Sequence, residues 1–391
     1  MNNNFDITNI LGSQEYILDK LVSFDTTSEK SNIAIVDFIE SFLRQNDVMP
    51  IRILNDEKTK ASLFYTIGQT DNNGTLFSAH TDTVPANKSE WSSDPYKLTL
   101  KDNRYYGRGT TDMKGFISIV LALTPWFQEQ KIVNPIHVAL SYDEEVGCLG
   151  VGPLIDEIRY KIKPPNLVIV GEPTELKIID RHKSCHTFET EFFGKKSHSA
   201  NPAWGCNSIY YATEFITKLR ELEEKLKIEY NDHNFDPPYT TISVGQIGGG
   251  VAHNVVPDYT KVTWNIRCLP NIDYNHILKD LFINQLPLIE KKMKKNHEIS
   301  HILNSNLSNI YPLRPSKILN TINLIKENMS PSQKGVSYGT DAGFFSNIGW
   351  PTIVCGPGNI SQAHKADEFI EIEDIRNGIL FFMDLIRGTS D

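Results

Sequence analysis

Three short apolar runs in the chain each end in side chains that can bind a metal ion. The runs cover 75–79, 136–141 and 166–170, and they lead into His80-Thr81-Asp82, Tyr142-Asp143-Glu144-Glu145 and Gly171-Glu172. Near-continuous apolar runs of this length are typical of strands in a sheet that helices cover on both faces. Ligands of such sheets bind beyond the carboxyl ends of the strands, so we expect these polar side chains to converge.

Two loops supply further candidate ligands. Asp112 lies in the glycine-rich segment 107–115, just before a predicted helix over 115–128, and His364 follows the turn at 355–358. Glycines beside an acid permit tight turns that bring the carboxylate close to an ion. Taken singly, each motif has a plainer interpretation, such as a surface hydrogen-bonded pair or a solvated acidic face. A phosphate cradle at 107–115 is disfavoured because the GxxxxGK[ST] spacing is missing. The joint occurrence of all five motifs predicts a metal site.

The pattern of the chain changes in its middle third. Segments 187–193, 239–244 and 260–267 alternate as half-exposed strands do, and 207–230 has the pattern of one long amphipathic helix. Before and after this stretch the chain has α/β character. We therefore predict a catalytic domain formed by 1–183 and 301–391, interrupted by a small α+β domain over 184–300.

Composition narrows the class of protein. A chain of 391 residues exceeds one ordinary core. A net charge of −9 argues against a nucleic-acid partner. The sequence has no apolar run of about 20 residues and no N-terminal secretory pattern, so neither a membrane span nor export is expected. The odd number of cysteines, without a CxxC pair, favours reduced thiols in the cytoplasm.

In order and local context, these motifs resemble those of the M20 metallohydrolases over nearly the whole chain. The resemblance implies a zinc-hydrolase domain with a mixed central sheet flanked by helices, and an inserted dimerisation or lid domain. It also implies two Zn²⁺ ions per chain, which Co²⁺ can replace. His80 and Glu172 would bind one ion, Glu145 and His364 the other, and Asp112 would bridge both. Three carboxylates and a hydroxide would balance the four positive charges.

The same resemblance assigns further roles. Glu144 would be the general base, and Asp82 would orient the ring of His80. His198, in segment 194–200, would stabilise the oxyanion. Asn254 and Arg267 would contact the substrate. Arg267 could hold a substrate carboxylate, or it could serve only as an ion-pair partner on a strand face.

Within this family, several stretches are most similar to acetylornithine deacetylases, namely 238–241, 254–257, 336–343 and 355–358. The implied reaction is hydrolysis of N-acetyl-L-ornithine, a small N-acyl amino acid, to L-ornithine and acetate in arginine biosynthesis. A homodimer through the inserted domain is expected. Succinyl-diaminopimelate desuccinylase, general aminoacylase and dipeptidase activities remain alternatives within the same architecture, and a non-catalytic binding protein is the alternative outside it.

Overall fold

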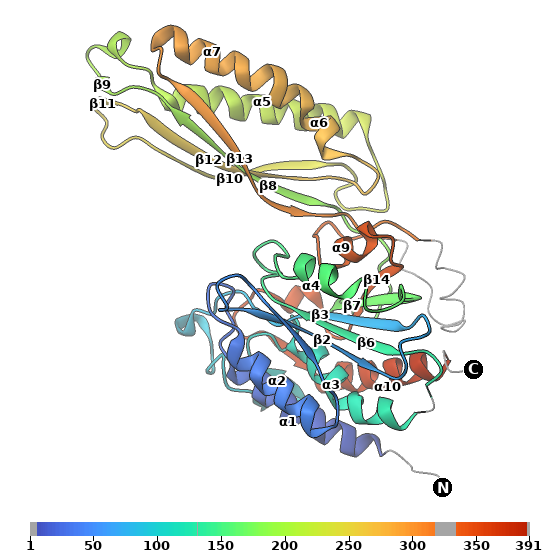
Figure 1. The fold of residues 1–391 in the computed structure, drawn as a ribbon. Coiled ribbons are helices and arrows are strands. Elements are labelled where there is room, and N and C mark those ends of the chain that lie inside the picture. The colour runs from blue at the N-terminus through green and yellow to red at the C-terminus, as the bar shows by residue number, and fades with distance from the viewer. Residues whose placement is uncertain (1–5, 131, 317–333, 389–391) are drawn as a thin grey trace. The chain divides into compact units, whose positions relative to one another are not determined.

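A computed structural model of the chain describes residues 6–130, 132–316 and 334–388 (Figure 1). The chain divides into two compact units. The first unit is built from both ends of the chain, up to Asp180 and again from Thr340 onward. The second unit consists of Arg181–Arg314 and Lys334–Gly339. An interrupted first unit with one main insertion is the organisation that the sequence predicts.

The first unit is organised around a six-stranded sheet. Its strand order is β1 (Ile51–Leu54), β2 (Ala61–Ile67), β6 (Ile136–Ser141), β3 (Thr75–His80), β7 (Leu167–Pro173) and β14 (Thr352–Gly356). The last four strands run parallel, whereas β1 and β2 are antiparallel to their neighbours. The sheet is therefore mixed, and the predicted fold class is confirmed. Strands β2, β3, β6 and β7 are almost wholly buried, as their continuous apolar runs require.

Helices cover both faces of this sheet. In Figure 1 the layer below the sheet consists of α1 (Ile7–Ser23), α2 (Ile33–Gln45), α3 (Lys114–Glu129) and α10 (Ile372–Gly388). The layer above it consists of α4 (Val151–Ile158) and α9 (Ala342–Asn347). Phe77 of β3 packs against Phe127 of α3 and Phe382 of α10, with ring centroids 6.1 and 5.3 Å away. Burying each such ring contributes about 1.5–3 kcal/mol. This packing fixes α3, and with it the loop that carries Asp112.

Short elements frame the loops at the sheet edge. β4 (Thr99–Lys101), β5 (Arg104–Tyr106) and β15 (Phe369–Glu371) form a small antiparallel sheet. The glycine-rich loop leaves β5, and the segment after His364 enters β15, so their pairing brings these two loops together. The single-turn helices η1 (Lys88–Glu90) and η5 (Ile360–Gln362) lie in the flanking connections.

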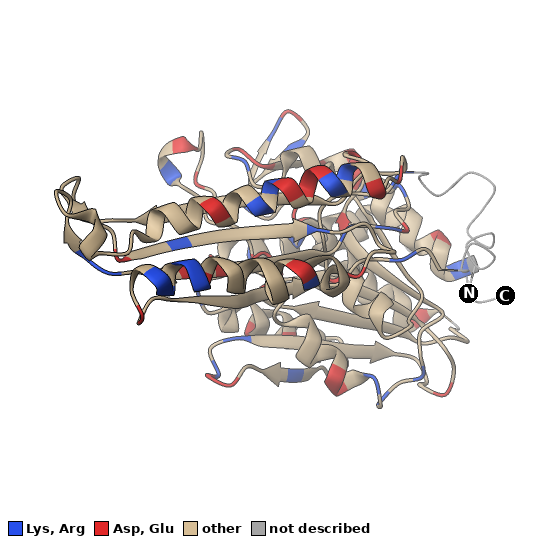
Figure 2. Cartoon of the chain, turned by 90° about the horizontal axis from the view of Figure 1, so that it is seen from above, with Lys and Arg blue, Asp and Glu red and all other residues tan. Residues whose placement is uncertain are grey.

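The second unit is an antiparallel sheet with helices packed on it. The strands are ordered β10 (Thr241–Gly249), β12 (Tyr259–Arg267), β8 (Cys185–Phe193) and β13 (His301–Ile310). The helical elements are α5 (Ser208–Glu229), α6 (Tyr274–Asp280), η3 (Leu281–Gln285) and α7 (Leu286–Asn296). Phe188 and Trp264 from the sheet stack 4.7 Å apart and share a buried core with Phe215 of α5. Figure 2 shows both signs of charge interspersed along the helices, and charged pairs such as Lys218–Glu221 at 2.8 Å lie on the solvent side of α5.

A two-stranded ribbon extends from this unit. β9 (Ser197–His198) pairs antiparallel with β11 (Val255–Val256), and η2 (Pro202–Trp204) follows β9. The ribbon follows the end of β8 and precedes the start of β12, so it lies at the Phe193–Tyr259 end of the main sheet.

Two local predictions need correction. The insert was predicted to end at residue 300, but β13 pairs with β8 and the unit continues to Arg314. As an edge strand β13 is largely exposed, so it lacks the apolar alternation that would have marked it. By its polar residues, segment 25–28 could cap a helix over 33–40, yet the residue before α2 is Asn32. Thr27 instead forms a bridge to Thr83, beside the end of β3.

All five cysteines are buried free thiols. Among the described residues, no helix has both the length and the apolar character that crossing a membrane requires.

Candidate metal centre

Three neighbouring strands deliver candidate ligands to one edge of the first unit's sheet. His80 is the last residue of β3 and pairs in parallel register with Ser141, the last residue of β6. Glu144 and Glu145 lie in the turn after β6, and Glu172 lies near the end of β7. Because β6, β3 and β7 are parallel neighbours, their carboxyl ends meet at this edge, as the sequence predicts.

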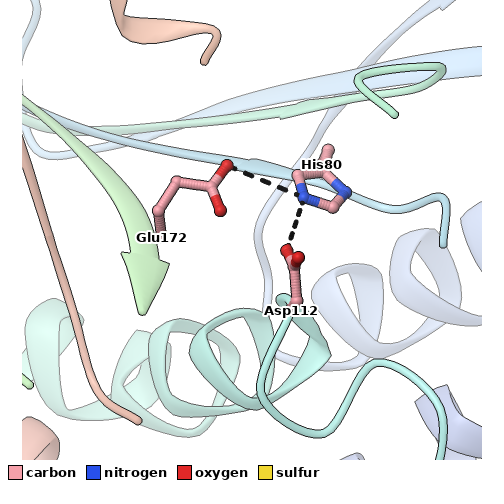
Figure 3. A group of neighbouring side chains, drawn as sticks. All are labelled: His80, Asp112 and Glu172. Atoms are coloured by element: carbon pink, nitrogen blue, oxygen red, sulfur yellow. Dashed lines mark hydrogen bonds and ion pairs between the residues drawn. The ribbon is translucent and has the colours of Figure 1, made fainter. Parts of the chain in front are cut away.

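His80, Asp112 and Glu172 form the first group of ligands (Figure 3). His80 Nε2 lies 3.1 Å from Asp112 Oδ1 and 3.7 Å from Glu172 Oε1. All three side chains are buried. They come from a strand end, a loop and a second strand, so the sheet and α3 together set their spacing.

Asp112, Glu145 and His364 form the second group. His364 Nε2 lies 3.3 Å from Asp112 Oδ2 and 3.0 Å from Glu145 Oε2. The two oxygens of Asp112 therefore face different histidines. Among the candidate ligands, this is the carboxylate whose geometry suits a shared ligand of two ions. His364 is the most exposed of the five candidate ligands, with 55% of its side chain exposed.

The site concentrates negative charge out of water. Burial, followed by the charge of Asp112, raises the pKa of Glu172 well above its ordinary value, and burial also raises the pKa of Glu145. Burial opposes ionisation of Asp112 as well, but hydrogen bonds from His364 and His80 hold its pKa far below the usual range. The same contacts with Asp112 and Glu145 raise the pKa of His364 to about 10. Cations placed between these groups would stabilise the ionised carboxylates and favour the neutral form of the histidines.

The residues present fit divalent metal ions. Glu145 Oε1 and Glu172 Oε1 are buried and have no hydrogen-bond partner among the residues that the structure describes. Such atoms are costly unless something binds them. Imidazole nitrogens and carboxylate oxygens are suitable ligands for zinc and similar ions.

Glu144 belongs to neither of these two groups and lies instead in a separate cluster with Cys148 and Asp341. Its side chain is only partly buried, and Cys148 Sγ lies 3.5 Å from Oε1. Burial, and next the charge of Glu172, raise the pKa of Glu144 well above its ordinary value. A carboxylate that lies beside a metal site and does not bind the metal remains free to exchange protons.

Asp82 contacts both His80 and the turn after β6. His80 Nδ1 lies 3.0 Å from the main-chain oxygen of Asp82, and the carboxylate is farther away, at 3.6 Å. The carboxylate also accepts hydrogen bonds from the backbone N–H groups of Glu144 and Glu145, at 3.1 and 3.2 Å. Asp82 thus lies against His80 with both its main-chain oxygen and its carboxylate, and its role in orienting the ring stays a prediction.

Glu368 is a residue of this site that the sequence analysis did not find. Its carboxylate accepts hydrogen bonds from Arg108 Nη1 and from the backbone N–H groups of Gly109, Thr111 and Asp112, at 2.7–3.1 Å. It is 1% exposed and lies four residues after His364. Glu368 thus joins the loop of one ligand to that of another. In the sequence Glu368 looks like an ordinary surface acid beside Asp367, and it has no motif spacing that would indicate a role.

The remaining predicted residues lie in the second unit. His198 and Asn254 are exposed neighbours on the two-stranded ribbon, where Ser199 N donates to the Asn254 carbonyl at 3.0 Å. Arg267 ends β12, and its Nη1 lies 3.4 Å from the Ser337 carbonyl. The register of β8 with β12 puts Arg267 at the opposite end of the sheet from the ribbon. The structure therefore brings His198 and Asn254 together but not Arg267.

Comparison with known proteins decides the family. The sequence pattern of peptidase family M20/M25/M40 matches residues 76–388. The chain belongs to this family. It is therefore a hydrolase, and the resemblance inferred from the motifs is confirmed. An acetylornithine deacetylase from Buchnera aphidicola is 31% identical over 344 residues, covering 88% of this chain and 87% of the relative.

Solved structures of M20 proteins share the fold. A metallo-carboxypeptidase from Sulfolobus solfataricus superposes with a TM-score of 0.76 at 18% identity, covering 96% of this chain and 99% of its own. A dinuclear metal-binding peptidase from Bacillus subtilis has a TM-score of 0.63 at 12% identity, covering 97% and 98% of the two chains.

Proposed function

We propose that this M20 hydrolase is a dinuclear zinc enzyme that converts N-acetyl-L-ornithine to L-ornithine and acetate, a step of arginine biosynthesis in the cytoplasm. The observation that carries the dinuclear site is Asp112, whose two oxygens face the two histidines. The solved M20 peptidase from Bacillus subtilis, which has a similar fold, is described as a dinuclear metal-binding protein. The substrate is supported by the relative from Buchnera aphidicola, which matches across 88% of this chain.

Two zinc ions held by these ligand groups would lower the pKa of a water molecule and polarise the amide carbonyl of the substrate. The chain supplies the proton transfers. Glu144, which neither group uses, would take a proton from the attacking water and deliver it to the leaving amine.

The second unit would supply the contacts with the acyl amino acid. Arg267 carries a fixed positive charge that suits the substrate carboxylate, and Asn254 offers an amide. His198 would stabilise the developing oxyanion. His198 and Arg267 lie at opposite ends of a sheet whose β12 has nine residues, a separation of roughly 25–30 Å at about 3.4 Å per residue. Both can therefore contact one small substrate only if they come from different chains, which supports a homodimer through this unit.

A panel of substrates tests the proposed reaction. Release of primary amine is followed with ninhydrin on acetylornithine, succinyl-diaminopimelate, an N-acetyl amino acid with an apolar side chain, and a dipeptide. We expect the highest kcat/KM on acetylornithine. A higher value on succinyl-diaminopimelate or on the dipeptide would replace the proposed substrate and leave the metal centre in place.

Metal content is expected to saturate at about two zinc ions per chain, because five ligands form two groups around one shared carboxylate. Dialysed protein is reconstituted with zinc and analysed by mass spectrometry of the metal. Saturation at one ion would contradict the shared role of Asp112, and no bound zinc would contradict the whole proposal.

His198 is expected to act in the partner's active site. Glu144→Ala and His198→Ala are each nearly inactive alone, and co-expression lets their subunits reassort. With random pairing half of the dimers are mixed, and one of the two sites in each mixed dimer has both residues intact, so about a quarter of all sites should regain activity. Mixed dimers shown by native mass spectrometry but without activity would place His198 in its own chain's site.

A further inference from the structure

The turn after β6 has to hold two adjacent glutamates in different places. Glu145 belongs to a ligand group, whereas Glu144 points elsewhere. The turn starts at Asp143, whose φ of 56° lies in the left-handed region that non-glycine residues seldom adopt. The surrounding structure has to impose such a conformation, since it costs of order 1 kcal/mol or more. The contacts that impose it therefore decide where both glutamates point.

One side of the turn is held by the carboxylate of Asp82. It accepts the N–H groups of Glu144 and Glu145, and Ser28 Oγ donates to its second oxygen at 2.7 Å. Ser28 is itself fixed beside the end of β3, because its N–H donates to the Thr83 carbonyl at 3.2 Å. These contacts hold the backbone of the turn from the inside of the site.

The other side of the turn is held by Lys60, a residue that belongs to none of the sequence motifs. Its Nζ contacts both carboxylate oxygens of Asp143 and the main-chain oxygen of Ser28. The side chains of Lys60 and Asp143 are only 13% and 9% exposed, so solvent screens this ion pair weakly. Lys60 thus closes a ring of contacts that runs through Ser28 and Asp82 to the two glutamates and back through Asp143.

We propose that Lys60 is a positioning residue of the active site, which acts through Asp143 and Ser28 to set the directions of Glu144 and Glu145. This inference rests on the proposed function for the tasks of the two glutamates. Without the ammonium group, the Asp143 carboxylate loses its buried counter-charge and the left-handed turn loses its outer support. Glu144 would then shift from the water that it activates, and Glu145 would shift from the second ion. His80 and Glu172 themselves lie on strands β3 and β7, outside this turn, so we expect their positions to change less.

The test compares Lys60→Met with Lys60→Arg, which keeps the charge. For Lys60→Met we expect kcat to fall roughly tenfold to a hundredfold with KM within about twofold, the size of effect that supporting contacts around a metal site have. The affinities for the two zinc ions are measured by competition with a chelator. The affinity for the more weakly bound ion should fall at least about tenfold, and the affinity for the more tightly bound ion should stay nearly unchanged. Lys60→Arg should recover most of both losses.

Lys58→Met is the matched control, since Lys58 lies in the same hairpin turn and is exposed. It should match the wild type in kcat and in both zinc affinities. The double variant Lys60→Met with Asp143→Asn should lose no more than Lys60→Met alone, because both changes break one contact.

Two results would overturn the proposal: unchanged zinc affinities and kcat in Lys60→Met, or equal weakening of both zinc affinities with a lowered Tm. The second would show general destabilisation of the unit. The zinc measurement needs no substrate. If the wild type failed to hydrolyse acetylornithine, the substrate assignment would be rejected, and the zinc affinities would still test the role of Lys60.

Discussion

Glu144→Gln should lose at least about a hundredfold in turnover while still binding two metal ions. Glutamine keeps the size and the hydrogen-bonding reach of the side chain but cannot take a proton. Since Glu144 belongs to neither ligand group, its replacement leaves every ligand atom in place. Steady-state kinetics and metal content on the same preparation provide the measurement.

Glu145→Gln is the informative comparison, because it changes the neighbouring residue in the same turn. Glu145 Oε2 lies 3.0 Å from His364 Nε2, so this variant should bind its second ion more weakly. Glu157→Gln, on the exposed side of α4, controls for the loss of one negative charge. If Glu144→Gln and Glu145→Gln had the same metal content, the two glutamates would not have separate tasks. Near-normal turnover by Glu144→Gln would remove it from the mechanism.

Asp112→Asn should have the largest effect of any single ligand change, a loss of about a thousandfold or more in kcat/KM. Asp112 is the one residue common to both ligand groups, and its oxygens lie 3.1 and 3.3 Å from the two histidines. An amide removes the negative charge that both ions share and leaves only one oxygen. Several kcal/mol of stabilisation by the metal ions would be lost, and each 1.36 kcal/mol is a factor of ten in rate.

Kinetics and zinc titration check this expectation, and both zinc affinities should fall together. Asp102→Asn provides the control, because Asp102 is exposed and its left-handed φ of 51° is one that asparagine tolerates. A variant that lost only one ion, or that kept turnover within tenfold of the wild type, would show that Asp112 serves a single ion.

Several features of this protein followed from local sequence. The run 136–141 matches the bounds of β6, and the other apolar runs match β3 and β7 to within three residues at either end. Such strands can be recognised because they are buried on both faces, so their apolar residues are not confined to alternate positions. The candidate ligands follow directly after these runs, and parallel pairing brings them to one edge. That is why the two ligand groups could be predicted from residues far apart in the chain.

Other features depend on contacts between distant segments that carry no local mark. Glu368 and Lys60 are charged residues of ordinary appearance, and only the packing of β15 beside β5 and of β2 beside β6 turns them inward. The edge strand β13 is exposed, so burial left no pattern in its sequence.

We could infer the buried parallel strands of the first unit, the order of the ligands and the family from sequence alone, because apolar residues and ligand residues are recognised by their type. The contacts of the Asp82 carboxylate with the backbone N–H groups of Glu144 and Glu145 depend on the fold and have no local pattern. A hydrogen bond goes to whichever partner the folded chain brings within about 3 Å.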